Sequence, residues 1–353
     1  MKIALIAALA ALAGPVVAQT PATTSAPTPA PATAPPSTAA AAPAPHSPTV
    51  LPGRGLDQHP FVYAGEWDTR KDQQSIFVVK GGKIVWSYSL PRVPEPGRIQ
   101  EFDDATMLAN GDIIFSHMIG AAEVRPDKTL AWSYDAPRGT EIHSIQAIGP
   151  HKVLIMRNGT PAEAMIIDTR SGKILQEIVI HTPVTSPHGQ FRHIRMTKAH
   201  TILVPHLGEG RVDEIDMQGN VIWSVAAKSP WQAVRLDNGD TLISGDWSKY
   251  VREVNPKGKT VWEFTQADVP DITLFNTQTA QRLANGDTLI SNWSAGDPHP
   301  EHWLDTVQFL EVSPDKKVVW ALRAWTPPGD LGPATSIQLL DQPGRADRLG
   351  AER

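Results

Sequence analysis

The sequence predicts an all-β protein, a six-bladed β-propeller of four-stranded blades whose ring is closed by the C-terminal strand joining the first blade. Three observations predict this fold. A Gly-Lys-x-x-Trp phrase recurs, in full or looser form, with its last position at 86, 132, 176, 223, 262 and 320, so the intervals are 46, 44, 47, 39 and 58 residues. A Leu-x-Asn-Gly-Asp phrase lies between several of these positions. The C-terminal segment carries one strand-like run that the first repeat lacks.

The Trp phrase predicts the outermost strand of each blade. Its full copies are residues 82–86 and 258–262, and only the copy at 172–176 has lost the Trp. A large rigid ring at the same place in successive repeats is suited to packing between neighbouring blades. We therefore expect these Trp side chains to be structural.

The Asn-Gly phrase predicts the turn between the two inner strands. Clear copies occupy 106–115, 234–244 and 281–291, and weaker ones occupy 145–155 and 194–204. Asn-Gly between two apolar runs is a strong hairpin signal because both residues tolerate positive φ.

The two ends of the repeat region complete one blade. Residues 61–67 resemble residues 241–247, which follow the Asn-Gly turn, so the first blade has no innermost strand of its own. Residues 335–344 resemble an innermost strand without a following repeat. We expect this strand to complete the first blade and to remove an exposed sheet edge. The propeller would then span residues 56–345, with a disordered tail at 346–353.

The N-terminal segments predict export. Residues 1–18 read as a signal peptide, with Lys2 followed by an apolar run too short to span a membrane. Residues 19–50 consist largely of Ala, Pro and Thr and should form a disordered linker. We expect a periplasmic or secreted protein without a membrane span.

Composition excludes several classes of function. The chain has no cysteine, which excludes disulfides, thiolate metal sites and a cysteine nucleophile. Its net charge of −5 offers no basic surface for nucleic acid. Serine-hydrolase, P-loop and zincin motifs are absent from the sequence. We expect a monomer that binds a small molecule and holds no cofactor or metal.

The starts of the innermost strands are the first candidate site, because these strands line the central channel of a propeller. We aligned the repeats on the Leu of the Asn-Gly phrase and took the residue five places earlier. The six positions are Asp103, His143, Phe191, Trp231, Gln278 and Thr335. The next positions are Asp104, Ser144, Arg192, Gln232, Thr279 and Ser336.

The loops between the second and third strands should open onto the same face. The residues predicted there are Glu66, Trp67, His117, Arg157, Asn158, His206, Asp246, Trp247, Asn292 and Trp293. Histidines from different repeats, namely His117, His143, His193 and His206, should therefore converge, where they could act as nucleophile, general base or metal ligand.

Two stretches resemble known propeller repeats. The Gly-Lys-x-x-Trp turn resembles the pyrroloquinoline-quinone-type (PQQ-like) repeat, although the quinoprotein dehydrogenases have eight blades and a cysteine pair. Residues 143–148 and 103–112 resemble the inner strands of arylsulfotransferase-like six-bladed propellers, in which His-Asp precedes a strand ending in Leu-Pro-Asn-Gly-Asn. The resemblance implies a channel histidine that is transiently sulfated, and His143 lies at the matching position.

Three functions remain open from the sequence. The first is binding of a small aromatic, anionic or sugar ligand at the channel mouth. It would stack on Trp231, Trp247 and Trp293, and it would be oriented by His143, His193, Gln278 and Arg157.

The second function is group transfer of the arylsulfotransferase type. The nucleophile would be His143 or His193, the acid–base partner His117 or His206, and the anion clamp Arg157 or Arg192. The third is a non-catalytic scaffold that binds another protein at its rim.

Overall fold

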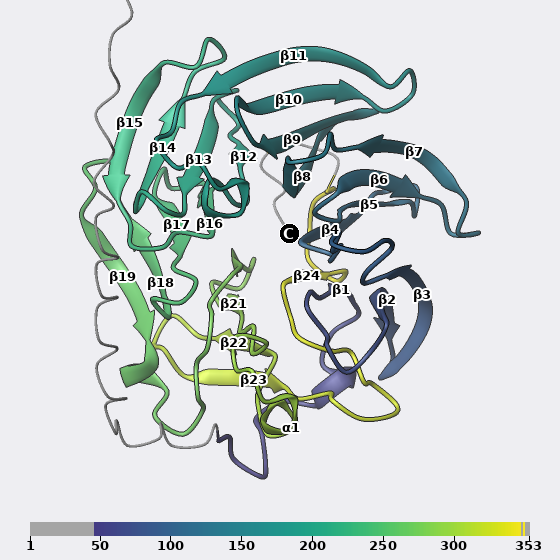
Figure 1. Cartoon of the computed structure of the whole chain (residues 1–353). Helices are drawn as coiled ribbons and strands as arrows, with labels where there is room; N and C mark the ends of the chain where they lie inside the picture. Colours follow the sequence, from purple (N-terminus) through teal and green to yellow (C-terminus); the bar gives the residue numbers. More distant parts are fainter. Residues whose placement is uncertain (1–45, 347–348, 350–353) are drawn as a thin grey trace, which may run out of the picture. The chain divides into compact units, whose positions relative to one another are not determined.

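Six antiparallel sheets of four strands each make up the part of the chain that the structure describes, residues 46–346 and 349 (Figure 1). The structure is a computed structural model. The predicted signal peptide, the predicted linker up to residue 45 and most of the predicted tail lie outside the described residues. All described residues belong to one unit, Ala44–Arg353.

The sheets follow one another along the chain, and each blade runs from an innermost to an outermost strand. Blade 1 contains β24 (Ser336–Leu339), β1 (Phe61–Ala64), β2 (Gln73–Lys80) and β3 (Lys83–Pro91). Blade 2 contains β4 (Asp104–Met107), β5 (Ile113–Ser116), β6 (Gly120–Val124) and β7 (Leu130–Asp135). Blade 3 contains β8 (Glu141–Gly149), β9 (Lys152–Asn158), β10 (Ala162–Asp168) and β11 (Lys173–Ile180).

The remaining sheets repeat this order. Blade 4 contains β12 (Arg195–Met196), β13 (Ile202–His206), β14 (Arg211–Ile215) and β15 (Val221–Ala226). Blade 5 contains β16 (Gln232–Arg235), β17 (Thr241–Ser244), β18 (Tyr250–Val254) and β19 (Thr260–Thr265). Blade 6 contains β20 (Ala280–Arg282), β21 (Thr288–Ser291), β22 (Phe309–Val312) and β23 (Val318–Leu322).

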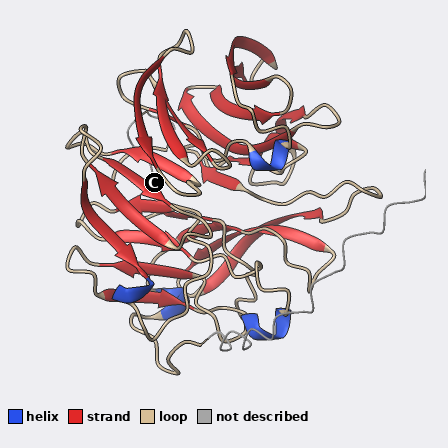
Figure 2. Cartoon of the chain, turned by 60° about the vertical axis from the view of Figure 1, so that its left-hand side comes forward, coloured by secondary structure: helices blue, strands red, loops and turns tan. Residues whose placement is uncertain are grey.

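Helical structure in the described chain is confined to single turns in the connections (Figure 2). They are η1 (Gly55–Asp57), η2 (Pro187–Gly189), η3 (Gln266–Asp268) and α1 (Pro300–Trp303). None of the helices among the described residues has the length and apolarity needed to cross a lipid bilayer. The all-β prediction is therefore confirmed.

The ring closes as predicted. β24 pairs with β1 in antiparallel register, from Phe61 opposite Leu339 to Ala64 opposite Ser336. The sheet of blade 1 thus joins strands from the two ends of the propeller, and Leu339 is fully buried in a cluster with Phe61 and Trp320. Closure gives β1 a partner on both sides, so its backbone groups cannot template pairing with another chain.

The repeated Trp side chains join neighbouring blades. The indole N–H of Trp86 donates to the carbonyl of Pro126 at 2.8 Å, and that of Trp262 donates to Pro314 at 3.1 Å. Each accepting Pro lies in the turn before the outermost strand of the next blade. Trp223 makes the equivalent bond to Pro256 at 2.9 Å. The sequence pattern is therefore explained by one interblade contact that recurs with the repeat.

The Asn-Gly turns have the same geometry in blades 2, 5 and 6. Gly239 has a φ of +89° and donates to the carbonyl of Leu236, while Leu236 donates to Asp240. The side chain of Asn238 accepts from the backbone N–H of Asp240 at 2.9 Å. Only the Gly takes positive φ, so the Asn serves here as a local acceptor that fixes the turn.

Blade 4 corrects the sequence alignment by one residue. Thr197 donates its backbone N–H to Thr201, which is the bond that Leu236 makes to Asp240 in blade 5. The residue five places before Thr197 is Arg192, so Arg192 and not Phe191 occupies the predicted channel-mouth position. Phe191 instead packs edge-on against the ring of His206, with the two ring centroids 4.8 Å apart. The weak repeat at 194–204 has no Asn-Gly, and so it did not define the turn.

The last residues of the segment predicted as a linker are described, and they contact the propeller. His46 donates its backbone N–H to Thr273 at 3.0 Å, and Arg323 donates to the side chain of Ser47 at 2.9 Å. Pro52 accepts a backbone bond from Ala321 in β23 at 3.1 Å. The segment 46–52 therefore lies along the outermost strand of blade 6.

Candidate functional site

Six buried side chains, one from each blade, form a ring at the starts of the innermost strands. We call them the mouth ring, and each is between 0% and 4% exposed. Its members are Asp103, His143, Arg192, Trp231, Gln278 and Thr335. Equivalent backbone bonds fix them, such as Trp231 to Ser244 at 2.9 Å and Thr335 to Ala64 at 3.1 Å. The fold therefore brings chemically different residues to equivalent places around one axis.

Three carboxyl groups meet beside the ring. Oxygen atoms of Glu66, Glu101 and Asp103 lie within 4.8 Å of one another, and all three side chains are buried. Gln278 donates its amide N–H to Glu66 at 2.8 Å. Burial, and then the charge of Asp103, raise the pKa of Glu66 to about 8. Burial likewise raises the pKa of Asp103 well above its usual range, so the cluster holds protons at neutral pH.

A fourth buried carboxyl, Asp246, approaches from blade 5. Burial raises its pKa to about 7, although Arg192 and a hydrogen bond from Asn276 at 2.9 Å oppose that shift. Clusters of carboxyls with raised pKa values are typical of functional sites, because burial that destabilises a charge is seldom kept without use.

His143 is held on both ring nitrogens. Its Nδ1 lies 2.8 Å from Asp103 Oδ1, and its Nε2 lies 2.7 Å from Glu141 Oε2. The same oxygen of Glu141 lies 3.1 Å from Nδ1 of His188. Burial and the charge of Arg192 lower the pKa of His143. Burial alone would raise the pKa of Glu141, but the two histidines outweigh it and lower that pKa.

Arg192 and His193 enter from the connection between blades 3 and 4. The guanidinium of Arg192 lies over the ring of Trp231, 4.7 Å from its centroid. Burial, followed by the charge of Arg195, lowers the pKa of His193 well below its usual value. His193 is therefore a neutral imidazole at neutral pH.

Seven buried polar atoms around the ring have no hydrogen-bond partner among the described residues. They are Glu66 Oε2, Asp103 Oδ2, Arg192 Nε, His193 Nε2, Trp231 Nε1, Gln278 Oε1 and Thr335 Oγ1. The first two belong to carboxyls that can share a proton with each other, so the other five are the atoms left for a ligand. Buried polar groups are nearly always hydrogen-bonded, so a concentration of unpartnered ones indicates a place for polar molecules.

Two glycines let the acidic loops reach the ring. A Cβ atom on Gly65 would lie 1.9 Å from the carbonyl oxygen of Pro333, and one on Gly245 would lie 2.0 Å from the ring of Tyr250. Each Gly directly precedes an acid and a Trp, Glu66-Trp67 and Asp246-Trp247. Only glycine allows the backbone to approach so closely, and this approach brings the carboxyl of the next residue to the mouth ring.

Three of the residues predicted for the site have partners elsewhere. His117 bonds Gln100 at 3.0 Å, and burial lowers its pKa to about 4. Arg157 donates to Tyr134 at 2.9 Å and pairs with Glu163.

His206 lies between Glu209 and Asp213, at 3.0 Å from each. Of the four histidines expected to converge, the structure places only His143 and His193 at the mouth. The other two lie at the ends of second strands, where their hydrogen bonds hold loops.

The two remaining predicted tryptophans differ in exposure. Trp247 is 52% exposed and directly follows the buried Asp246. Trp293 is half-buried and donates its indole N–H to the backbone carbonyl of Glu66 at 3.3 Å. Trp247 therefore offers a free aromatic face, whereas Trp293 supports the loop that carries Glu66.

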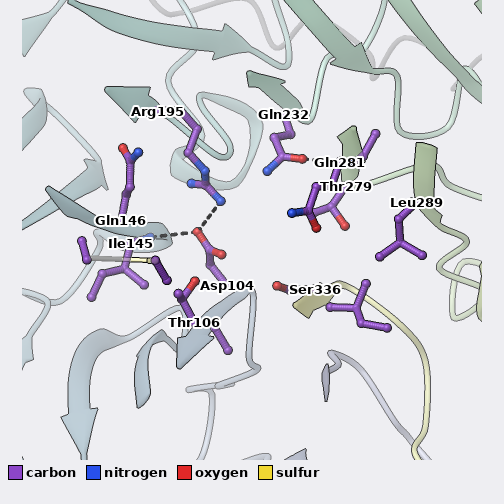
Figure 3. A pocket seen from close by; sticks show the side chains of 15 residues that line it. Asp104, Thr106, Ile145, Gln146, Arg195, Gln232, Thr279, Gln281, Leu289 and Ser336 are labelled. Carbon is purple, nitrogen blue, oxygen red and sulfur yellow. Dashed lines mark hydrogen bonds and ion pairs between the residues drawn. The ribbon is translucent and has the colours of Figure 1, made fainter. Parts of the chain in front are cut away.

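The channel beyond the ring is narrow and polar (Figure 3). Its cavity has a volume of about 40 Å³ and is lined by innermost-strand residues that include Asp104, Gln146, Arg195 and Gln232. Asp104 pairs with Arg195 at 2.9 Å and accepts the backbone N–H of Ile145 at 3.1 Å. This volume holds a few water molecules and no organic ligand. Larger hollows, of about 420 and 680 Å³, lie beside the turn between β16 and β17.

The site contains residues that the sequence analysis did not select, namely Glu101, Glu141 and His188, and it contains Glu66 and Asp246, which the analysis placed in loops on this face without giving them a role. The sequence contained one pattern that could have identified Glu141. Glu141 and His143 are two residues apart in a strand, so their side chains share a face. The other members come from loops, where the repeat gives no register.

The fold and the mouth ring together define a six-bladed β-propeller with a buried, acidic, hydrogen-bonding site at one end of its channel. No protein-family model and no curated protein matches the chain. A solved structure of a protein of unknown function from Bacteroides caccae is similar, with 26% identity and a TM-score of 0.68, over 79% of this chain and 97% of that one.

A second similar structure is a catalytically inactive virginiamycin B lyase from Staphylococcus aureus with quinupristin. It shares 13% identity and a TM-score of 0.50, over 77% of this chain and 88% of that one. This likeness supports the propeller fold.

Proposed function

We propose that the protein is an exported ligand-binding propeller whose mouth ring takes a neutral polyhydroxylated molecule, such as a sugar. The observation that carries this proposal is the set of unpartnered buried donors and acceptors around Glu66, Asp103 and Gln278. Hydroxyl groups both donate and accept, so vicinal hydroxyls can satisfy carboxyl, carboxamide and guanidinium atoms together.

The aromatic contribution comes from Trp247. Its indole is 52% exposed beside Asp246, so it can pack against the apolar face of a sugar ring. A neutral ligand suits the mouth, because the protonated carboxyls of Glu66, Glu101 and Asp103 offer donors as well as acceptors without a charge.

Entry of the ligand requires the covering loops to move. The ring atoms are closed to solvent, and His188 lies over His143 with ring centroids 5.3 Å apart. Loops that cover a site built on rigid strands are a common arrangement for binding.

The test is isothermal titration calorimetry, in which the purified protein is titrated with each of a panel of neutral mono- and disaccharides. Trp247→Ala should weaken binding roughly tenfold, since packing of an indole against the apolar face of a sugar is worth about 1 kcal/mol or more. Val261→Ala, an exposed apolar residue of β19, is the matched control and should bind as the parent does. Equal affinity of the two variants would refute the role of Trp247.

A second candidate is group transfer of the arylsulfotransferase type, and one observation favours it. His193 is a neutral imidazole whose Nε2 is buried and unpartnered among the described residues, so this nitrogen can act as a nucleophile in the tautomer that carries its proton on Nδ1, and Arg192 adjoins it in sequence. Both ring nitrogens of His143 are already bonded. The sulfuryl group would pass from the donor oxygen to Nε2 as the phenolate leaves.

Incubation with an aryl sulfate and a phenol acceptor distinguishes the candidates. Transfer that is lost in His193→Gln would establish the enzyme. Transfer by neither protein, together with no sugar binding, would leave the scaffold function.

A further inference from the structure

We propose that Glu141, His143 and His188 form a binding site for one divalent transition-metal ion at the edge of the channel mouth. The donor atoms of the three residues lie within 4.8 Å of one another. Two imidazole nitrogens and one carboxylate oxygen are a common donor set for Zn²⁺ and for other late divalent metals. Its three ligands are not members of the carboxyl cluster, which the site adjoins through the hydrogen bond between His143 and Asp103.

The three donors already converge through hydrogen bonds to one shared carboxylate oxygen. A single oxygen of Glu141 faces both histidines, at 2.7 Å from Nε2 of His143 and 3.1 Å from Nδ1 of His188. When Nδ1 of His143 donates to Asp103, its Nε2 turns a lone pair toward the Glu141 carboxylate. A metal ion between these atoms would take the place of the protons in the two hydrogen bonds to Glu141 and bond all three donors.

Asp103 supplies the support that a metal-bound histidine usually has. Its Oδ1 lies 2.8 Å from Nδ1 of His143, on the side of the ring opposite Glu141. A carboxyl oxygen in this place can accept the Nδ1–H of His143 and so fix the tautomer and the orientation of the ring, which leaves Nε2 able to ligate.

The elements that carry the ligands differ in rigidity and exposure. Glu141 and His143 lie on one face of β8, and His143 is 1% exposed. His188 lies in η2, and its side chain is 57% exposed. The site thus has a fixed inner half and an outer ligand from a loop, so an ion can enter from solvent and keep a position open to water.

The sequence contains a competing candidate, the pair His299 and His302. Their rings are 5.0 Å apart beside α1, but each histidine pairs with a separate carboxyl, Glu301 and Asp297 respectively. Among the described residues, the groups in which three donors converge are the present one and the carboxyl cluster, and the His299 pair is in neither.

The experiment is a titration of the full chain, freed of metal and of any affinity tag, with Co²⁺ followed by visible absorption and with Zn²⁺ in competition. The parent protein should bind one Co²⁺ with ligand-field bands of a nitrogen–oxygen site, and Zn²⁺ should displace it. His188→Ala should weaken binding roughly tenfold or more, since it removes a ligand from an exposed turn without opening the core.

Two control variants make the outcome decisive. His181→Ala removes an exposed histidine of the same connection, and His299→Ala with His302→Ala removes the competing pair. Both should bind Co²⁺ as the parent does. Absence of Co²⁺ binding in the parent, unchanged binding in His188→Ala, or loss of binding in the His299/His302 variant would each overturn the proposal.

Discussion

Replacing Glu66 with Gln should remove a pH dependence of stability that the buried carboxyls impose. Burial and the charge of Asp103 raise the pKa of Glu66 from its ordinary value of 4.5 to about 8. Between these values the folded protein binds a proton that the unfolded chain has released. The free energy of unfolding therefore falls as pH rises through this window, by about 1.4 kcal/mol per pH unit for one proton.

The structure shows why Gln is the right replacement. Its carbonyl can accept the bond that Gln278 now donates to Glu66 at 2.8 Å. Its NH₂ group can donate toward Asp103, where the neutral carboxyl of Glu66 now holds a proton. The variant should therefore match the parent below about pH 4.5 and exceed its stability by about 1.4 kcal/mol near pH 5.5 and about 3.4 kcal/mol near pH 7.

The assay is urea unfolding of metal-free protein, followed by Trp fluorescence at several pH values between about 5.5 and 7. Glu177→Gln, which changes an exposed carboxyl on β11, serves as the control and should keep the slope of the parent. If Glu66→Gln keeps that slope as well, the carboxyls do not share a proton and the argument fails.

Three further predictions concern the fold. Trp262→Phe removes the hydrogen bond to the carbonyl of Pro314 and should lower the free energy of unfolding, measured in urea, by about 1 kcal/mol. An unchanged urea midpoint would contradict the interblade role of Trp262. His117, whose pKa burial lowers to about 4, should stay neutral well below its ordinary value of 6.5; an NMR titration midpoint near 6.5 would rule this out. Because the unfolded chain takes up the proton first, this histidine makes stability fall as pH drops from 6.5 toward 4. Leu339→Ala in the closing strand should cost about 2–5 kcal/mol, against under about 0.5 kcal/mol for the exposed Leu175→Ala, and equal losses would refute the closure argument.

The candidate site shows which residues an alignment of the repeats places correctly and which it does not. The alignment on Leu-x-Asn-Gly placed five of the six mouth-ring residues, because a hairpin turn fixes the register of the strand that enters it. In blade 4 the turn has no Asn-Gly, and a shift of one residue put Phe191 where Arg192 lies. A slip of one residue turns a strand's side chains to the opposite face, so the error exchanged an apolar residue for a cation.

The sequence by itself determined the number of blades, the order of their strands, the structural role of the repeated Trp and the strand that closes the ring. These features depend on the residues of each turn and on the spacing of the repeats, and both can be recognised directly in the sequence.

The tertiary structure alone decided which polar residues meet. Glu66 reaches Asp103 because Gly65 passes against Pro333, and His188 reaches Glu141 because a loop folds back over β8. The same structure pairs His117 with Gln100, in the connection between blades 1 and 2, and His206 with Glu209 and Asp213 in blade 4. Such contacts join loops far apart in sequence, and their burial sets the pKa values that make the mouth chemically distinct.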